Sequence, residues 1–74
     1  MKFYGYSLED KETSIKLREV SFQGKSEEIR KIAKFLNYAA EQMERYGEDF
    51  CHEHIIDFYP DWKAIKDPDL IVVR

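Results

Sequence analysis

The longest regular pattern in the chain is a helical spacing of apolar residues in its middle third. Apolar side chains recur there every three or four positions, flanked by further aromatic side chains, at Ile29, Ile32, Ala33, Leu36, Ala40 and Met43, with Phe35, Tyr38 and Tyr46 beside them. This period is typical of one face of a helix. Ser26 is a suitable N-cap, acidic Glu27 and Glu28 favour the positive end of the helix dipole, and Gly47 suits a left-handed C-cap. The pattern predicts one long helix over residues 26–46.

Shorter apolar segments on both sides of this helix predict strands. Two precede it, at residues 3–8 and 14–23, and two follow it, at residues 51–59 and 70–73. The predicted fold class is α+β, with the order ββαββ, as a four-stranded, mostly antiparallel sheet and one long helix packed on one face. We expect a single domain over residues 1–74.

Two of these strands carry a further expectation. In residues 14–23, Ile15 and Leu17 share one side of a strand whereas Val20 and Phe22 share the other, which requires a bulge near Arg18 or partial cover of both faces. The continuous apolar run at residues 70–73 favours a strand covered on both sides or paired centrally. Between the last two strands, a polar connection over residues 63–69 has room for one short helical turn.

Composition narrows the class of protein. The chain is 43% hydrophobic and 15% aromatic with only three Gly and two Pro, which argues against disorder and low complexity. Its single cysteine, Cys51, excludes an internal disulfide and a paired-cysteine metal site. Without an apolar run long enough for a membrane span or a signal peptide, we expect a small cytoplasmic domain with no membrane partner.

The net charge of −3 conceals an uneven distribution. Residues 1–40 carry eight basic and six acidic residues, whereas residues 41–69 carry three basic and nine acidic ones. A basic footprint for nucleic acid is therefore absent, and we expect no nucleic-acid partner. The acidic second half is either an ordinary solvated surface or a field that steers a basic protein partner.

The sharpest local motif is the run His52-Glu53-His54. On a strand the two imidazoles lie on the same side and could converge on a metal ion, but zinc needs further ligands. Of the nearby candidates, Asp49, Cys51 and Asp57, the last two have the wrong strand parity. We therefore expect no metal and no cofactor, and a structural or interface role for the pair; a small metal-binding regulatory protein is the alternative.

Catalytic patterns are missing from the sequence. Cys51 and His52 are neighbours on the predicted strand, so their side chains diverge and cannot act as a nucleophile with its base. No glycine-rich phosphate loop, nucleophile elbow or metalloprotease helix motif is present. A chain of 74 residues also encloses a deep substrate pocket with difficulty. We expect no enzymatic activity and assign no catalytic residue.

An aromatic run follows the histidines, at Phe58, Tyr59 and Trp62. One interpretation places Phe58 and Trp62 in the core or as a lid over the helix. The other makes Tyr59 and Trp62 exposed anchors of a protein interface, where these residue types are enriched. The acidic neighbours Asp57 and Asp61 favour a protein partner over a base-stacking surface, which needs positive charge.

The order of these features resembles a known family. The run from Val20 to Gly24 leads into the helix sequence SEEIRKIAKFL, followed by Ala39-Ala40, the His52-Glu53-His54-Ile55 strand and the final DLIVV. Over residues 18–74 the chain is similar to the immunity protein 32 family of bacterial polymorphic toxin systems. The resemblance implies a non-catalytic protein that binds and neutralises a cognate toxin domain.

Many such toxins attack nucleic acid with basic clefts, which an acidic surface can occupy. The predicted toxin-binding residues are the acidic, aromatic and histidine side chains of the second half: Glu48, Asp49, His52, Glu53, His54, Asp57, Tyr59, Asp61 and Trp62. The protein is then a monomer or a homodimer. A further alternative is a homodimeric adaptor that pairs the edge strand at residues 70–73.

Overall fold

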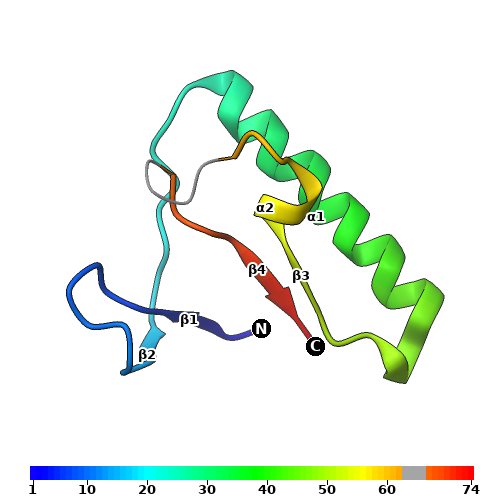
Figure 1. Ribbon diagram of the computed structural model, residues 1–74, viewed down its shortest axis with the longest axis horizontal. Helices are drawn as coiled ribbons and strands as arrows, with labels where there is room; N and C mark the ends of the chain where they lie inside the picture. The colour runs from blue at the N-terminus through cyan, green and yellow to red at the C-terminus, as the bar shows by residue number, and fades with distance from the viewer. Residues whose placement is uncertain (63–66) are drawn as a thin grey trace.

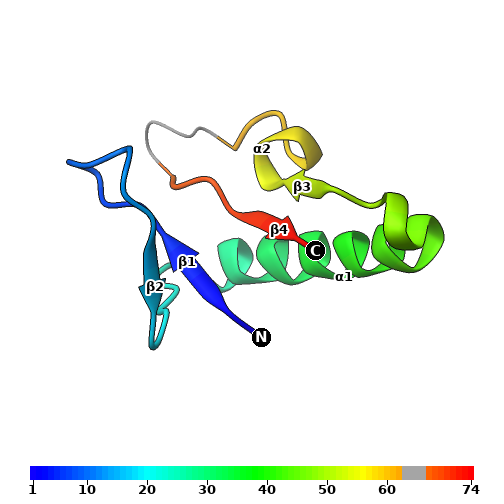
Figure 2. The ribbon, with the colours of Figure 1, turned by 90° about the horizontal axis from the view of Figure 1, so that it is seen from below.

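A computed structural model describes residues 1–62 and 67–74 of the chain. Its elements follow one another in the order β1 (Phe3–Gly5), β2 (Ile15–Leu17), α1 (Ser26–Tyr46), η1 (Gly47–Asp49), β3 (His52–His54), α2 (Ile55–Phe58) and β4 (Ile71–Val73). The hairpin of β1 and β2 lies to one side, and α1 runs along the opposite side (Figure 1). Figure 2 shows β3, β4 and α2 together in a layer on one side of α1.

The long helix α1 has the predicted bounds, but its N-cap is Lys25 rather than Ser26. The carboxylate of Glu28 accepts a hydrogen bond from the Lys25 backbone N–H at 2.8 Å, so a free backbone donor of the first turn is satisfied by an acid already inside the helix. At the other end, Gly47 has a φ of 55° and donates its backbone N–H to the Met43 carbonyl. Gly47 therefore ends the helix with a positive φ, but its ψ of −122° lies outside the left-handed helical region that was predicted.

The α+β class is confirmed, whereas the single four-stranded sheet is wrong. The strands form two separate antiparallel pairs, β1 with β2 and β3 with β4. Phe3 lies opposite Leu17 in the first pair, and His52 lies opposite Val73 in the second. Among the described residues, no strand of the first pair is hydrogen-bonded to a strand of the second.

The second strand is shorter than predicted. It ends at Leu17, and residues 18–24 contain neither helix nor strand. Val20 and Phe22 therefore never enter the strand that holds Ile15, and both remain exposed. The conflict of parity in the sequence is resolved by the end of the strand, and no bulge is required.

The third strand departs furthest from the prediction, because it ends at His54 and residues 55–58 form the one-turn helix α2. The Tyr59 N–H closes this turn on the Ile55 carbonyl at 2.8 Å. A strand would point Ile55 and Phe58 to opposite sides, whereas a helical turn brings residues three apart to one side. Here Ile55 is fully buried, and the Phe58 ring lies 4.7 Å from that of Tyr38 and 5.8 Å from that of Phe35 on α1.

The core is small and lies between α1 and the layer of β3 and α2. Among the described residues it consists of Phe35, Ala39, Phe50 and Ile55. Phe35, predicted only as a flank of the apolar stripe, is its centre, while Ile29 and Leu36 of the predicted stripe are exposed. The apolar face of α1 is therefore wider than the layer that covers it.

The last strand occupies the predicted place but not the predicted environment. Ile71 is 47% exposed and Val73 is 60% exposed, so β4 is covered on one face only. The helical turn expected within residues 63–69 falls largely on residues 63–66, which lie outside the described residues. In the part of the chain that the structure describes, no helix is long and apolar enough to cross a membrane.

Candidate functional site

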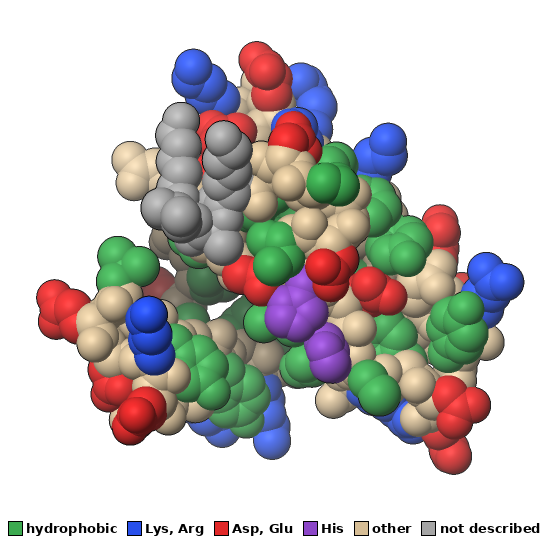
Figure 3. All heavy atoms as spheres, viewed as in Figure 1, with side chains coloured by type: hydrophobic (Ala, Val, Ile, Leu, Met, Phe, Trp, Pro, Cys, Tyr) green, Lys and Arg blue, Asp and Glu red, His purple; other side chains and the backbone are tan. Residues whose placement is uncertain are grey.

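The outward face of the β3–β4 pair carries both histidines. Cross-strand partners lie on the same face of a sheet, so the pairs His52–Val73 and His54–Ile71 share this side, and Glu53–Val72 takes the other. The two imidazole rings meet edge to face with their centroids 5.0 Å apart. Figure 3 shows both histidines together in the middle of the visible face. The prediction that these side chains share one side is confirmed.

One of the two histidines has an acidic partner that sequence reasoning missed. Nδ1 of His54 lies 2.7 Å from Oδ2 of Asp69, with the two side chains 29% and 25% exposed. When Nδ1 carries a proton it donates to the carboxylate, which orients the ring and leaves Nε2 facing away as an acceptor or second donor. The other carboxylate oxygen, Oδ1 of Asp69, is buried and has no hydrogen-bond partner among the described residues.

Asp69 reaches His54 only through the fold, because fifteen positions separate them in the chain. The antiparallel pairing of β4 with β3 brings Ile71 opposite His54, and the Ile55 N–H bonds the Leu70 carbonyl at 2.9 Å. The residue just before this ladder is thus held beside the imidazole. We define the histidine face as His52, His54, Asp69, Ile71 and Val73.

The predicted candidates for a third metal ligand lie elsewhere. Cys51 is exposed, and its Sγ lies 3.9 Å from the Asp49 carbonyl. Asp57 lies on α2 rather than on β3. In the described parts of the chain, no group of three or more His, Cys, Asp or Glu side chains is placed to hold a metal ion. The two imidazoles can therefore form hydrogen bonds and apolar contacts with a binding partner.

A second set of predicted residues gathers around Lys31 on α1. The rings of Tyr59 and Trp62 stack with centroids 6.5 Å apart, and Nζ of Lys31 lies 5.5 Å from the Tyr59 centroid and 3.7 Å from Oδ2 of Asp61. Nε1 of Trp62 donates to the Pro68 carbonyl at 2.9 Å. We call Tyr59, Asp61 and Trp62 the aromatic cluster.

The structure supports the packing interpretation for Phe58, whose ring lies against Phe35 and Tyr38, while the interface role of Tyr59 and Trp62 stays a prediction. Phe58 packs into the core, whereas Tyr59 and Trp62 are half-buried and Asp61 is exposed. A half-buried Tyr or Trp with a fixed rotamer is the type of side chain that anchors protein interfaces, because little conformational entropy remains to be lost on binding.

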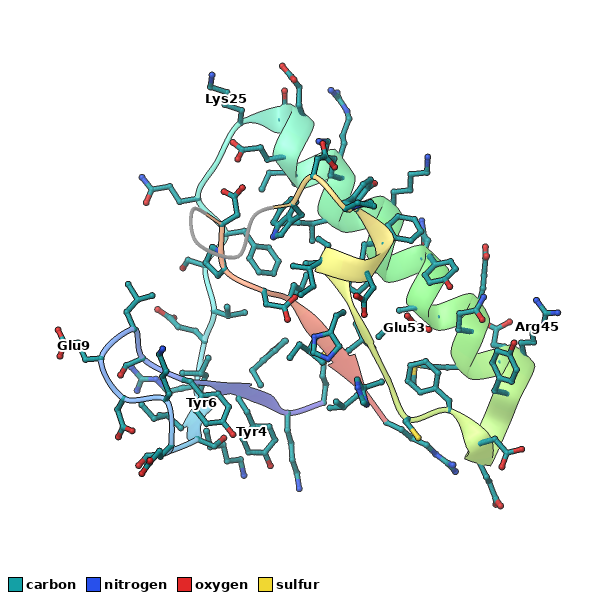
Figure 4. The ribbon with its side chains drawn as sticks, in the orientation of Figure 1. Tyr4, Tyr6, Glu9, Lys25, Arg45 and Glu53 are labelled. Atoms are coloured by element: carbon teal, nitrogen blue, oxygen red, sulfur yellow. The ribbon has the colours of Figure 1, made fainter. Side chains whose placement is uncertain are left out.

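The remaining predicted residues do not join either group. Glu48 and Asp49 lie in η1, beyond the C-terminal end of α1, and the rise of the helix places that end about 24 Å from Lys31. Glu53 is half-buried and points from β3 toward α1 (Figure 4). The nine predicted residues are thus spread along the whole molecule, and the fold brings together only the histidine pair and the aromatic cluster.

Comparison of the chain with models of protein families, with curated proteins and with solved structures found no match. The resemblance to immunity proteins therefore depends on the residues of this chain alone, above all on the helix and the His52-Glu53-His54 strand that follows it.

Proposed function

We propose that the protein is a non-catalytic immunity protein that binds and neutralises a cognate bacterial toxin domain. The observation that carries the proposal is the composition of the histidine face. Two imidazoles and a carboxylate stand there beside two uncovered β-branched side chains, Ile71 and Val73. Apolar area edged by directional polar groups is the usual make-up of a protein interface.

The aromatic cluster extends this surface. It follows α2 directly in the chain, and α2 shares a layer with β3 on one side of α1 (Figure 2). Tyr59 and Trp62 supply aromatic anchors, and Asp61 supplies a carboxylate that is 76% exposed. This replaces the broader predicted site: Glu48 and Asp49 lie at the end of α1 far from the aromatic cluster, and Glu53 points toward α1.

The charge of this half of the chain supports a basic partner. The acidic excess over residues 41–69 accelerates encounter with a basic toxin cleft, and the apolar contacts at Ile71 and Val73 then slow dissociation. Inhibition of this kind needs a tight surface and no active site of its own. A cytoplasmic location fits a protein that protects the cell which makes the toxin.

The experiment is capture and rescue with the product of a toxin-like gene adjacent to the gene of this protein. Co-expression is expected to restore growth of cells that carry the toxin domain, and the purified proteins are expected to form a complex. Asp57 is exposed on α2, between His54 of the histidine face and the aromatic cluster in the chain. Asp57→Lys and Asp61→Lys are therefore expected to weaken binding about tenfold and to flatten its dependence on salt.

Glu44→Lys is the matched control. Glu44 is also exposed but lies on α1, and its substitution by Lys makes the same change in charge. This variant is expected to bind nearly as the parent protein does. Equal losses in all three variants would mean that net charge alone governs the encounter. Failure of rescue and capture with every adjacent gene product would refute the proposal.

A further inference from the structure

The first third of the chain contributes nothing to the core. Within residues 1–24, which we call the arm, only Gly5 and Leu17 are half-buried and every other residue is exposed. The strands β1 and β2 contact each other far more than any other helix or strand. A hairpin of two three-residue strands is marginal in water when it has nothing to pack against. The arm therefore needs cover from outside its own fold.

The accessible surface and the radius of gyration of the chain also indicate an uncovered face. Its accessible surface is 6768 Å², whereas a compact monomer of 8.9 kDa exposes about 4,800 Å². The radius of gyration is 13.0 Å, compared with about 11 Å for a compact domain of this length. Each chain thus exposes about 2,000 Å² more surface than a compact folded protein of this size does.

Most of the exposed large apolar side chains lie on the arm. Among the described residues they are Met1, Phe3, Tyr4, Tyr6, Leu8, Ile15, Val20 and Phe22 on the arm, Ile71 and Val73 on β4, and Ile29, Leu36 and Tyr46 on α1. A groove of about 380 Å³ runs between the arm and the body, and Tyr6, Phe22, Ile29, Trp62 and Leu70 are among its lining residues. Figure 3 shows the molecule hollowed between these two parts, and Figure 4 places Tyr4 and Tyr6 on the arm.

We propose that a second copy of this chain covers this open face, and that the free protein is a two-fold homodimer. The open area is the first reason. If each copy buries its excess of about 2,000 Å², the pair loses about 4,000 Å², which lies within the range of obligate homodimers.

Charge is the second reason. The arm has four basic and four acidic residues, so it is neutral, whereas the rest of the chain carries the whole net charge of −3. Two identical acidic chains repel each other least when they meet through their neutral parts. In a contact between the neutral arm and β4 (Ile71–Val73), which carries no charged residue, like charges are not brought together.

Strand edges are the third reason, and they define the geometry. Among the described residues β1 is paired only with β2, and β4 only with β3, so each has a free edge. A two-fold axis that sets β1 of one copy against β4 of its partner makes the reciprocal contact at the same time. Both free edges of both copies are then paired, and Tyr4 and Val73 of different copies become neighbours.

The test is the mass in solution of the purified full chain, by sedimentation over micromolar to millimolar concentrations. The parent protein is expected to sediment at twice 8.9 kDa. Val73→Lys places a charge on the edge of β4 and is expected to raise the dimer dissociation constant about 100-fold. Tyr46→Lys is the matched control, because Tyr46 is an equally exposed apolar residue at the far end of α1, and this variant is expected to remain a dimer.

Circular dichroism of each variant checks that α1 is retained, so that a monomer is not mistaken for an unfolded chain. A parent protein that is monomeric at every concentration would overturn the proposal. A folded Val73→Lys variant that dimerises as well as Tyr46→Lys would overturn it too.

Disulfide trapping tests the geometry in a chain whose exposed native thiol is removed by Cys51→Ser. Copies with Tyr4→Cys are mixed with copies with Val73→Cys and oxidised. A disulfide that forms readily in the mixture and poorly in either variant alone is expected. Trapping of Val73→Cys with itself alone, which indicates a β4–β4 contact, would overturn the proposed pairing.

The dimer contact and the proposed toxin-binding surface share Ile71 and Val73 on β4, so the two complexes would compete for these side chains, but each proposal is tested separately. A dimer can form whether or not the protein neutralises a toxin, and rescue can succeed with a monomer. Sedimentation of the free protein tests the dimer, and the rescue assay tests toxin neutralisation. Either proposal can therefore be refuted without the other.

Discussion

Removal of the His54 imidazole tests the energetic role of the half-buried contact between His54 and Asp69 on the histidine face. His54→Ala deletes the partner of Asp69, whose Oδ2 then joins Oδ1 as a carboxylate oxygen without a hydrogen bond inside the described parts of the chain. Asp69→Ala instead leaves an imidazole that water can still solvate. The double variant His54→Ala/Asp69→Ala removes both polar groups together.

The geometry sets the size of the effect. A hydrogen bond to a charged group contributes about 1.5–3 kcal/mol to stability, and an orphaned buried acceptor costs about the same. Both side chains retain more than a fifth of their exposure, so water recovers part of this energy. We expect His54→Ala to cost about 2 kcal/mol, with a coupling of about 1–1.5 kcal/mol between the two sites.

Urea denaturation at one fixed protein concentration measures all four proteins of this double-mutant cycle. His52→Ala is the control: His52 is exposed, sits in the same strand and has only an edge contact with the His54 ring, so its loss should cost less than about 0.5 kcal/mol. Additivity of the two single substitutions within about 0.3 kcal/mol would refute the reasoning, because independent sites add. Equal costs for His52→Ala and His54→Ala would do the same.

Three further predictions concern stability. Phe35→Ala leaves a cavity at the centre of the core and should lower the free energy of unfolding by about 3–5 kcal/mol. The total free energy of unfolding for a chain of this length is about 4–11 kcal/mol. A variant with full helical circular dichroism and an unchanged urea midpoint would contradict this prediction. Gly47→Ala should cost about 1–2 kcal/mol by urea denaturation although no atom lies within 4 Å of the added Cβ, because the φ of 55° alone disfavours a side chain; an unchanged midpoint would show that the helix end adjusts freely. Hydrogen bonds from the Glu12 backbone N–H, then from the Thr13 side chain and the Thr13 backbone N–H, lower the pKa of Asp10 below its ordinary 3.8. Its stabilisation of the turn is therefore complete above that pH and is lost as the pH falls through the lower folded-state pKa. The amide resonances of Glu12 and Thr13 should titrate with a midpoint below 3.8, and a midpoint at or above that value would contradict the turn geometry.

Local periodicity predicted the parts of this fold that depend on local chemistry. The bounds of α1, the positive φ of Gly47 and the common side of His52 and His54 all follow from spacing along the chain. Each depends on residues at most four positions apart, where the backbone geometry itself places the side chains. The bounds of the strands were less certain, because a short apolar run fits either a strand or a helical turn.

Tertiary structure decided what spacing leaves open. The segment 55–58 became helical because a turn lets Ile55 be buried while Phe58 packs against Phe35 of α1, and this packing outweighs the local preference of β-branched residues for strands. Asp69 met His54 through the pairing of β3 with β4, a contact between residues fifteen positions apart that no local pattern encodes.

The sequence by itself therefore determined a long amphipathic helix, short strands around it and an outward pair of histidines. Which apolar residues are covered was decided only by the tertiary structure, since burial depends on what packs against each face. The apolar stripe of α1, the arm and β4 all have the composition of core elements, yet the fold of a single chain leaves much of them in contact with water. Hydrophobic spacing specifies which side of a helix or strand is stabilised by burial. Only the arrangement of all the elements determines whether that side is buried within the same chain.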